Sequence, residues 1–533
     1  MIIQGRTVRQ DLRETVDVCV IGSGAGGAVA AKELAQAGLS VAVLEAGENH
    51  DPTTFSRYTP EMLLRLFWDG GMRTTHDGSV LISQGRHVGG STVHNLCYTV
   101  RTPDPILERW EAEFGTQDLS PSDLSPSLDR VEATLGVNQI REAQVNRLNQ
   151  IIRRGCHAMG WRGLVQRHNR AACPDCSADC VLGCPVSQPG IGKQSMAVSY
   201  IPQALEAGAR LYTDCLTEGI VAENGRVVGA TARFRSGDML LPEQAKPKPS
   251  SSENSAGKRG RETYRLTVRS SAVVLAAGAI NSPQLWLSSR LPDPGKQVGR
   301  NLHLHPAIFI GGIFDEEVDA YQGIPQSFYV DHFLDLARNP DSGYILMPAF
   351  GPMPLVAASM PSFGRAHRDL MRSYRNAAGV LVLLHDQSPG RVKVNRRGNP
   401  VIRYRLNRTD KASLVEGLIH GAQLLFAAGA KQVTLPYTRG GVLKSESDLE
   451  VIRQRGVVEN EILIASSHPQ GTLRMGSDSR RTVVDSYGSA HTVDGLFVAD
   501  ASLFPTSIGV PPMLTIAAMA DRIARRMAAN WPP

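Results

Sequence analysis

VDVCVI at residues 16–21 decides the fold, because it runs directly into GSGAGG at residues 22–27 and then, after an alanine-rich segment, into LSVAVLE at residues 39–45. An apolar run, a glycine-rich turn, a helical segment and a second apolar run ending in an acid predict a β-strand, a tight turn, an α-helix and a second strand. Such a unit binds a dinucleotide. The pattern does not separate FAD from NAD.

Each glycine of this turn has a physical role in such a unit. Gly22 makes the bend, Gly24 allows the backbone to approach a pyrophosphate at the helix N-terminus, and Gly27 lets the helix pack closely on the strand. Ala25 begins the helix, and Glu45 is placed to accept hydrogen bonds from ribose hydroxyls. We therefore predict the dinucleotide here.

Composition limits the class of protein. The chain has 533 residues, enough for two or three packed lobes rather than one domain. Its net charge of +6 comes from 57 basic and 51 acidic residues without a long basic block, so no nucleic-acid partner is expected.

The first residues, MIIQGR, lack the charged and apolar regions of a secretory signal, and no uncharged apolar run reaches the length of a membrane span. We expect a cytoplasmic protein without a membrane span.

The order of segments predicts an α/β fold: a Rossmann-like nucleotide-binding domain and a second α+β substrate domain built on an antiparallel sheet. The first domain takes residues 1–306, with inserted cap or substrate segments at about 105–215, and it resumes at residues 461–533. The substrate domain takes residues 307–460. Residues 242–261, rich in Pro, Ser, Lys and Gly, are expected to form a mobile hairpin tip.

Several individual elements can be predicted from local pattern. Residues 219–229 read as a strand pair around an Asn-Gly turn. The alternating segments 379–384 and 391–394 predict strands of the antiparallel sheet. Helices are expected near 413–428 and at 513–527, the second of them amphipathic.

Four separated motifs together resemble the glucose-methanol-choline (GMC) family of FAD-dependent oxidoreductases, over nearly the whole chain and nearest to its long-chain alcohol oxidase and sugar dehydrogenase branch. The motifs are GGSTVHN (89–95), LAAGAINSPQL (275–285), SHPQGTLRMG (467–476) and VADASLFP (498–505). The resemblance implies bound FAD and a substrate cavity over its isoalloxazine ring. It also implies oxidation of a small-molecule alcohol, with oxygen or a quinone or protein as electron acceptor.

The resemblance also assigns positions to the cofactor. Beyond the residues of the first turn, it implies contacts from residues spread over the whole chain: Arg86, Gly90, Ser91, His94, Asn95, Val221, Ala277, Asp500, Ala501, Pro512 and Met513.

In the family, a histidine beside the flavin takes the hydroxyl proton of the alcohol while the carbon-bound hydrogen leaves as hydride to N5, and the matching position is His468. An imidazole with its ordinary pKa of about 6.5 suits a base working near neutrality. The family usually presents a second His or Asn about forty residues later, where this chain has Pro511. The chain therefore uses one side-chain base, recruits a residue such as His303 or His305, or runs a different reaction.

Pro511 and Pro512 are compatible with the start of the final helix, because a first turn tolerates missing N–H donors. The amides that follow, and the positive end of the helix dipole, would then stabilise negative charge developing near N1 and C2=O of the flavin.

His94 has two interpretations. Some members of the family join FAD covalently through a histidine in this motif, and the spacing from Gly89 onward is similar. The alternative is packing of the ring against the flavin without a bond.

Four cysteines lie close together at Cys173, Cys176, Cys180 and Cys184. Their spacing is similar to a run that ligates an iron–sulfur cluster, four thiolates also suit structural zinc, and the third possibility is unligated or disulfide-linked cysteines.

Two other functions remain open at this stage. One is a lyase of the hydroxynitrile lyase type that keeps FAD as a structural element. The other is the flavin subunit of an electron-transfer dehydrogenase complex, which metal in the cysteine cluster would support.

Overall fold

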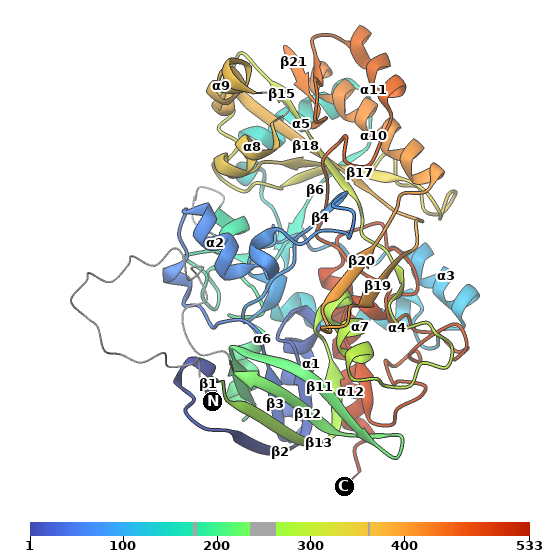
Figure 1. Cartoon of the computed structure of the whole chain (residues 1–533). Coiled ribbons are helices and arrows are strands. Elements are labelled where there is room, and N and C mark those ends of the chain that lie inside the picture. Colours follow the sequence, from blue (N-terminus) through green and yellow to red (C-terminus); the bar gives the residue numbers. More distant parts are fainter. Residues whose placement is uncertain (174–178, 235–262, 361–362, 533) are drawn as a thin grey trace, which may run out of the picture.

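The computed structural model describes residues 1–173, 179–234, 263–360 and 363–532 (Figure 1). The expected hairpin tip at 242–261 lies outside the described residues. The described chain forms two large sheets, one at each end of an elongated molecule, with the segments that connect them between. No helix in the described ranges is long and apolar enough to cross a membrane.

The first sheet is built around the strand of the glycine-rich unit. Its order is β1-β10-β3-β2-β13-β12-β11, with β24 also paired to β13. Parallel pairing joins β1, β10, β3, β2, β13 and β24, whereas β12 runs antiparallel to β13 and β11. Its strands are β1 (Ile2–Gln4), β2 (Leu12–Ile21), β3 (Val41–Leu44), β10 (Arg210–Thr213), β11 (Cys215–Glu223), β12 (Arg226–Phe234), β13 (Arg265–Leu275) and β24 (Leu496–Val498).

Burial explains why β2 reads as a continuous apolar run. Its second half, Val18–Ile21, is fully buried because helices cover it, whereas its first half alternates with solvent. α1 (Ala25–Gln36) packs against the sheet, α6 (Tyr200–Glu206) and α12 (Met513–Ala529). The first half of α12 is therefore covered on all sides, and its exposed side chains begin near Arg525.

The second sheet confirms the predicted antiparallel architecture. Its order is β22-β21-β15-β18-β17-β16-β6, and β23 joins β15 to β4. All pairs are antiparallel except β4 with β23. Its strands are β4 (Val80–Ile82), β6 (Gly163–Val165), β15 (Ala307–Ile313), β16 (Phe328–Val330), β17 (Tyr344–Ala349), β18 (Ala377–Leu384), β21 (Gln432–Thr434), β22 (Val442–Leu443) and β23 (Ile464–Ser466).

Helices surround both sheets. The long helix expected near 413–428 is α10 (Arg408–Ala427), which starts earlier because the Asn407 side chain caps it by accepting from Asp410 N at 2.7 Å. The remaining helices are α2 (Thr59–Leu66), α3 (Asp104–Phe114), α4 (Pro121–Thr134), α5 (Arg147–Ala158), α7 (Gly278–Ser288), α8 (Met353–Ser359), α9 (Gly364–Arg372) and α11 (Glu450–Arg455). A small sheet contains β14 (Arg300–Leu302), β19 (Gly390–Val394) and β20 (Pro400–Arg403), so residues 391–394 are a strand outside the large antiparallel sheet.

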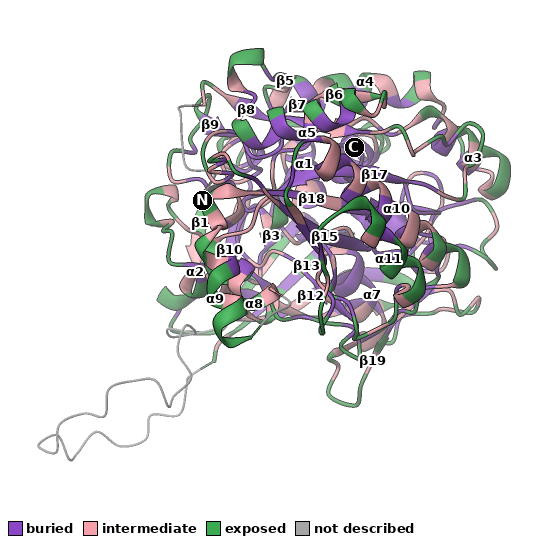
Figure 2. Cartoon of the chain, turned by 90° about the horizontal axis from the view of Figure 1, so that it is seen from above, coloured by how far each residue is buried: buried purple, intermediate pink, exposed green. Residues whose placement is uncertain are grey.

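Seen from above, the interior of the molecule is continuously buried, and exposed residues lie on its rim (Figure 2). Two large apolar clusters, one on each sheet, make up most of this interior. The segments that carry the sequence motifs connect the two sheets.

Candidate active site

The glycine-rich turn has the geometry that its sequence predicts. Gly22 has φ +99°, and a Cβ atom there would lie 2.4 Å from Ala276 O. A Cβ on Gly27 would lie 1.9 Å from Gly22 O, so the helix can pack this closely only without a side chain. At Gly24 the nearest atom to a Cβ is Gly90 Cα at 3.9 Å. That side of the turn is open to a ligand.

Glu45 is a buried carboxylate beside the turn. One oxygen accepts from Ser23 N at 3.0 Å and Ser23 Oγ at 2.7 Å, and the other accepts from Gly47 N at 2.8 Å. Burial raises the pKa of Glu45, and these hydrogen bonds oppose the rise. Since a carboxylate has about four acceptor positions, capacity remains for a further hydroxyl.

The GGSTVHN loop packs directly on the turn. Glu48 and His87 form a parallel bridge, and Gly89 N donates to Ser23 Oγ at 3.1 Å. A Cβ on Gly90 would lie 2.8 Å from Gly24 Cα. The two glycine segments thus lie back to back.

Two further predicted residues belong to this loop. Ser91 Oγ accepts from Gly85 N at 2.9 Å and holds the loop closed. The Arg86 guanidinium is largely buried near Glu45 and lies 5.5 Å from the Trp68 ring.

The end of this loop lies against the start of α12. Asn95 Nδ2 donates to Met513 Sδ at 2.9 Å, and Pro512 is the residue preceding the helix. The first intrahelical bond of the turn is Ile516 N to Pro512 O at 2.9 Å. The amides before Ile516 therefore have no acceptor within the helix and can face a ligand.

Asp500 follows a strand end that touches α1, and its carboxylate holds the neighbouring segments by hydrogen bonds. Its carboxylate accepts from Gly278 N at 2.8 Å, Ser282 Oγ at 2.5 Å and Ser502 N at 2.8 Å, and burial raises its pKa. A Cβ on Gly26 would lie 1.6 Å from Ala499 O, so this strand end touches the helix of the glycine-rich unit.

The structure brings most of the predicted cofactor residues together, and one stands apart. Ala277 precedes α7 and Ala501 follows Asp500, so both lie at the carboxyl ends of β13 and β24. Val221 lies on β11, at the far edge of the first sheet, where it pairs with Gly229.

His468 reaches this region because two parallel strands end side by side. β4 leads into the GGSTVHN loop, and β23 leads into His468, with Ser466 paired to Ile82. The chain after His468 then runs beside the Asp500 segment, since Gly471 N donates to Ala501 O at 3.0 Å. His468 is half-buried, and desolvation lowers its pKa to about 4, below the ordinary value that the sequence suggested.

His305 is the histidine that lies beside His468. His305 Nδ1 lies 3.3 Å from His468 Nδ1, and the rings are nearly perpendicular. His305 Nε2 accepts from Gly509 N at 3.2 Å. Desolvation, and to a smaller extent His468, holds the pKa of His305 well below 6.5, so both rings are neutral at pH 7.

These contacts assign the protons of the neutral pair. Because His305 Nε2 accepts from Gly509, its proton lies on Nδ1 and is donated to His468 Nδ1. His468 then carries its own proton on Nε2, the nitrogen that remains for a substrate.

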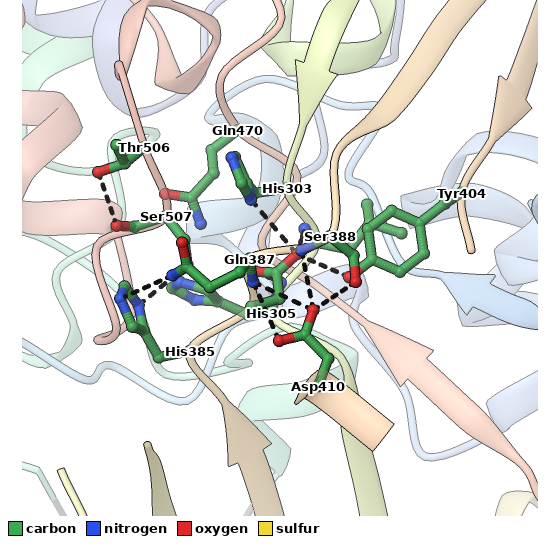
Figure 3. Close-up of polar contacts among 12 residues, drawn as sticks. His303, His305, His385, Gln387, Ser388, Tyr404, Asp410, Gln470, Thr506 and Ser507 are labelled. Atoms are coloured by element: carbon green, nitrogen blue, oxygen red, sulfur yellow. Dashed lines mark hydrogen bonds and ion pairs between the residues drawn. The ribbon is translucent and has the colours of Figure 1, made fainter. Parts of the chain in front are cut away.

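Asp386 fixes His305 in an unusual backbone conformation. His305 has φ +46°, and Asp386 accepts from His305 N at 3.1 Å, Leu304 N at 3.0 Å and Tyr404 Oη at 2.7 Å. Figure 3 shows this buried polar cluster around His305. Sequence reasoning missed Asp386 and Gly509. A local signal for Asp386 is its place two residues after the end of β18.

His303 has a different place. Its Nδ1 lies 3.6 Å from Asp386 Oδ2, beyond hydrogen-bond distance, and its backbone pairs with Gln470. The structure therefore gives His468 a contact with His305 alone of these two histidines.

His94 carries an unpartnered polar atom. Its Nε2 is buried without a hydrogen-bond partner, and its ring lies 4.0 Å from the Phe67 ring. Burial holds its pKa well below 6.5. An orphaned ring nitrogen in the loop beside the dinucleotide turn fits a bound cofactor that covers it.

The cysteine cluster is described in part, because Cys176 lies outside the described residues. Cys180 and Cys184 are free thiols in this structure, and Cys173 is the first of the described residues of the cluster. Over the described residues, no group of three or more His, Cys, Asp or Glu is arranged to hold a metal ion.

Comparison with known proteins agrees with this geometry. Family models described as GMC oxidoreductase match residues 63–307 and 386–520, and one described as FAD binding domain matches residues 17–57. An uncharacterized GMC-type oxidoreductase of Mycobacterium tuberculosis is 31% identical over 96% of this chain and 76% of its own.

Two more comparisons bear on the chemistry and the fold. Long-chain-alcohol oxidase FAO1 of Arabidopsis thaliana is 29% identical over 99% of this chain and 69% of its own. The crystal structure of formate oxidase superposes with a TM-score of 0.69 at 16% identity, over 98% of this chain and 99% of that chain.

Proposed function

The chain belongs to the GMC oxidoreductase family and is an FAD-dependent oxidoreductase, and from this premise we propose that it oxidises an alcohol to a carbonyl compound with His468 as the proton acceptor. The observation that carries the proposal is the contact between His305, which is buried, and His468. His468 follows β23, the strand paired with β4, which leads into the GGSTVHN loop. Similarity to a long-chain-alcohol oxidase favours an apolar alcohol as substrate.

The residues of the glycine-rich unit fit FAD. The open side of Gly24 would face the pyrophosphate, Glu45 retains capacity for a ribose hydroxyl, and the uncovered His94 Nε2 lies in the adjoining loop. When bound, FAD supplies an acceptor for the hydride that leaves the alcohol carbon, at flavin N5.

His468 would act through both of its ring nitrogens. Nδ1 lies against His305, and Nε2 would face the alcohol hydroxyl. Nε2 accepts the hydroxyl proton only when the proton of His468 lies on Nδ1, shared with His305. The contact from Gly509 N–H favours the opposite tautomer, so proton uptake is coupled to release of Gly509 by His305.

The start of α12 supplies the complementary electrostatics. Its free amides and the positive end of its dipole lie beside Asn95 of the GGSTVHN loop. With FAD bound, they would stabilise negative charge near the flavin, which would lower the barrier to oxidation.

Residues 307–460 are proposed to shape the substrate side, because they carry most of the second sheet and hold Asp386, which fixes His305. His94 is consistent with either covalent attachment through Nε2 or packing against the flavin. Acid precipitation separates the two states, because yellow colour stays with the pellet only if a bond exists.

Anaerobic stopped-flow mixing with a panel of primary, secondary, sugar and aromatic alcohols tests the proposed function. We expect at least one alcohol to bleach the flavin, and His468→Ala to keep FAD bound while bleaching slows by about 100-fold or more. Retained bleaching in His468→Ala would remove His468 from the mechanism. Turnover of substrate without bleaching in the wild type would instead indicate a lyase.

A further inference from the structure

Two thiols that are far apart in the sequence meet beneath the GGSTVHN loop. Cys97, two residues after Asn95, is fully buried, and Cys180, from the Cys173–Cys184 cluster, is 3% exposed. Arg170 Nη2 contacts both Cys180 Sγ and the carbonyl of Leu96, the residue before Cys97, so the two thiols are neighbours, and each affects the pKa of the other. Both are free thiols in this structure. In the sequence Cys97 is far from the Cys173–Cys184 cluster, and only the fold brings it near Cys180.

Two buried cations surround this thiol pair. The Arg170 guanidinium donates from Nη2 to Cys180 Sγ at 3.6 Å and to Leu96 O at 2.9 Å. The Lys193 ammonium donates to Cys180 O at 2.7 Å. Arg170 and Lys193 are 2% and 1% exposed, so their charges act in a medium of low dielectric.

This setting makes Cys180 the more reactive of the two thiols. Its hydrogen bond with Cys97, together with the positive charges of Arg170 and Lys193, lowers the pKa of Cys180 although burial opposes the change. Burial raises the pKa of Cys97. A thiolate beside a neutral thiol is the arrangement of an attacking and a resolving cysteine.

The cations also hold the backbone of the GGSTVHN loop. Lys193 Nζ donates to Val93 O at 2.7 Å and to Asn95 O at 2.5 Å, on either side of His94. Arg170 holds Leu96 O, the next carbonyl along the chain. A chemical change at Cys180 therefore reaches the residues beside the cofactor through hydrogen bonds that already exist.

We propose that Cys97 and Cys180 form a reversible dithiol–disulfide site that is oxidised by hydrogen peroxide and whose state alters the GGSTVHN loop. The Cys180 thiolate attacks one peroxide oxygen, the O–O bond breaks, and hydroxide leaves with formation of a sulfenic acid. Cys97 sulfur then attacks Cys180 sulfur. The S–S bond forms, the S–O bond breaks, and the protons of both thiols end in two molecules of water.

The electron balance is that of a two-electron oxidation. Two thiols lose two electrons, and one peroxide is reduced to two waters. A dithiol reductant such as dithiothreitol reverses the step by exchange. The site needs only added peroxide, so this inference does not rest on the proposed oxidation of alcohols.

Peptide mapping of the purified holoenzyme tests the site. After treatment with hydrogen peroxide and blocking of free thiols with N-ethylmaleimide, we expect a Cys97–Cys180 disulfide peptide that dithiothreitol removes. Cys19, Cys156 and Cys215, which are buried elsewhere in the chain, are the internal controls and stay as free thiols. Absence of the disulfide, pairing of Cys180 with Cys184, or iron or zinc bound stoichiometrically at the cluster overturns the proposal.

Two variants separate the chemistry from a purely structural role. In Cys97→Ser, peroxide should produce a Cys180 sulfenic acid that dimedone traps, because the resolving thiol is absent. In Cys180→Ser, neither product should form. Release of FAD, followed by flavin fluorescence, should change by about 3-fold or more when the wild type is oxidised and should stay constant in Cys180→Ser. Equal release from oxidised and reduced wild type would refute the link to the loop.

Discussion

Substitution of Gly24 by alanine tests where the dinucleotide lies more directly than any change in the catalytic residues. The backbone at Gly24 has φ −71°, which alanine adopts without strain, and a Cβ atom would meet nothing closer than Gly90 Cα at 3.9 Å. The apoprotein should therefore fold normally and gain about 0.4–1 kcal/mol from the less flexible unfolded chain.

The new methyl group instead stands where the pyrophosphate approaches the backbone. Displacing one charge-assisted hydrogen bond costs about 1.5–3 kcal/mol, which corresponds to about 10- to 150-fold weaker binding of FAD. Titration of apoprotein with FAD, followed by quenching of flavin fluorescence, measures the change. Thermal unfolding of the same apoprotein measures the stability.

Gly27→Ala is the matched control, since its Cβ would lie 1.9 Å from Gly22 O. This overpacking should lower the stability of the apoprotein by about 1–3 kcal/mol or more, whether or not ligand is present. If Gly24→Ala binds FAD as tightly as the wild type, the assignment of this turn to the cofactor is wrong.

Three further outcomes follow from the same geometry. Glu45→Gln should weaken FAD binding by about 5-fold or more in the same titration. The reason is that the amide NH₂ replaces one carboxylate oxygen and then faces the Ser23 N–H or the Gly47 N–H, which are also donors. An unchanged affinity would contradict this. His305→Asn should slow flavin reduction by about 5- to 150-fold, because asparagine tolerates the positive φ but leaves His468 Nδ1 without its partner. The control His303→Asn should change that rate by less than about 3-fold. Equal effects of the two substitutions would argue against a role for the His305–His468 contact. Histidines with a lowered pKa, such as His468 with a pKa of about 4, take up protons on unfolding below pH 6.5. The free energy of unfolding should therefore fall as the pH drops from 6.5 towards 4, by up to about 1.4 kcal/mol per pH unit for each group. A thermal midpoint that stays constant over that range would show that these rings are not held neutral.

The sequence predicted those parts of the molecule whose conformation is required locally. Gly22 has a positive φ, and a side chain on Gly27 would clash with Gly22 O within the same turn, so the glycine-rich unit could be predicted without a structure. The alternation of residues 379–384 likewise predicted a strand of the antiparallel sheet. The start of α10 was predicted too late, because its first turn is polar and is defined by the Asn407 cap.

Only the tertiary structure decided which residues meet at the site. His305 lies against His468 because β15 and β23 pair in the second sheet, and Cys97 lies near Cys180 because Arg170 contacts both Leu96 O and Cys180 Sγ. Strand register and loop crossing depend on the packing of the whole core, which no local pattern contains. The sequence by itself therefore determined the FAD-binding unit and the family, whereas the contact between His305 and His468 and the thiol pair were determined by the fold.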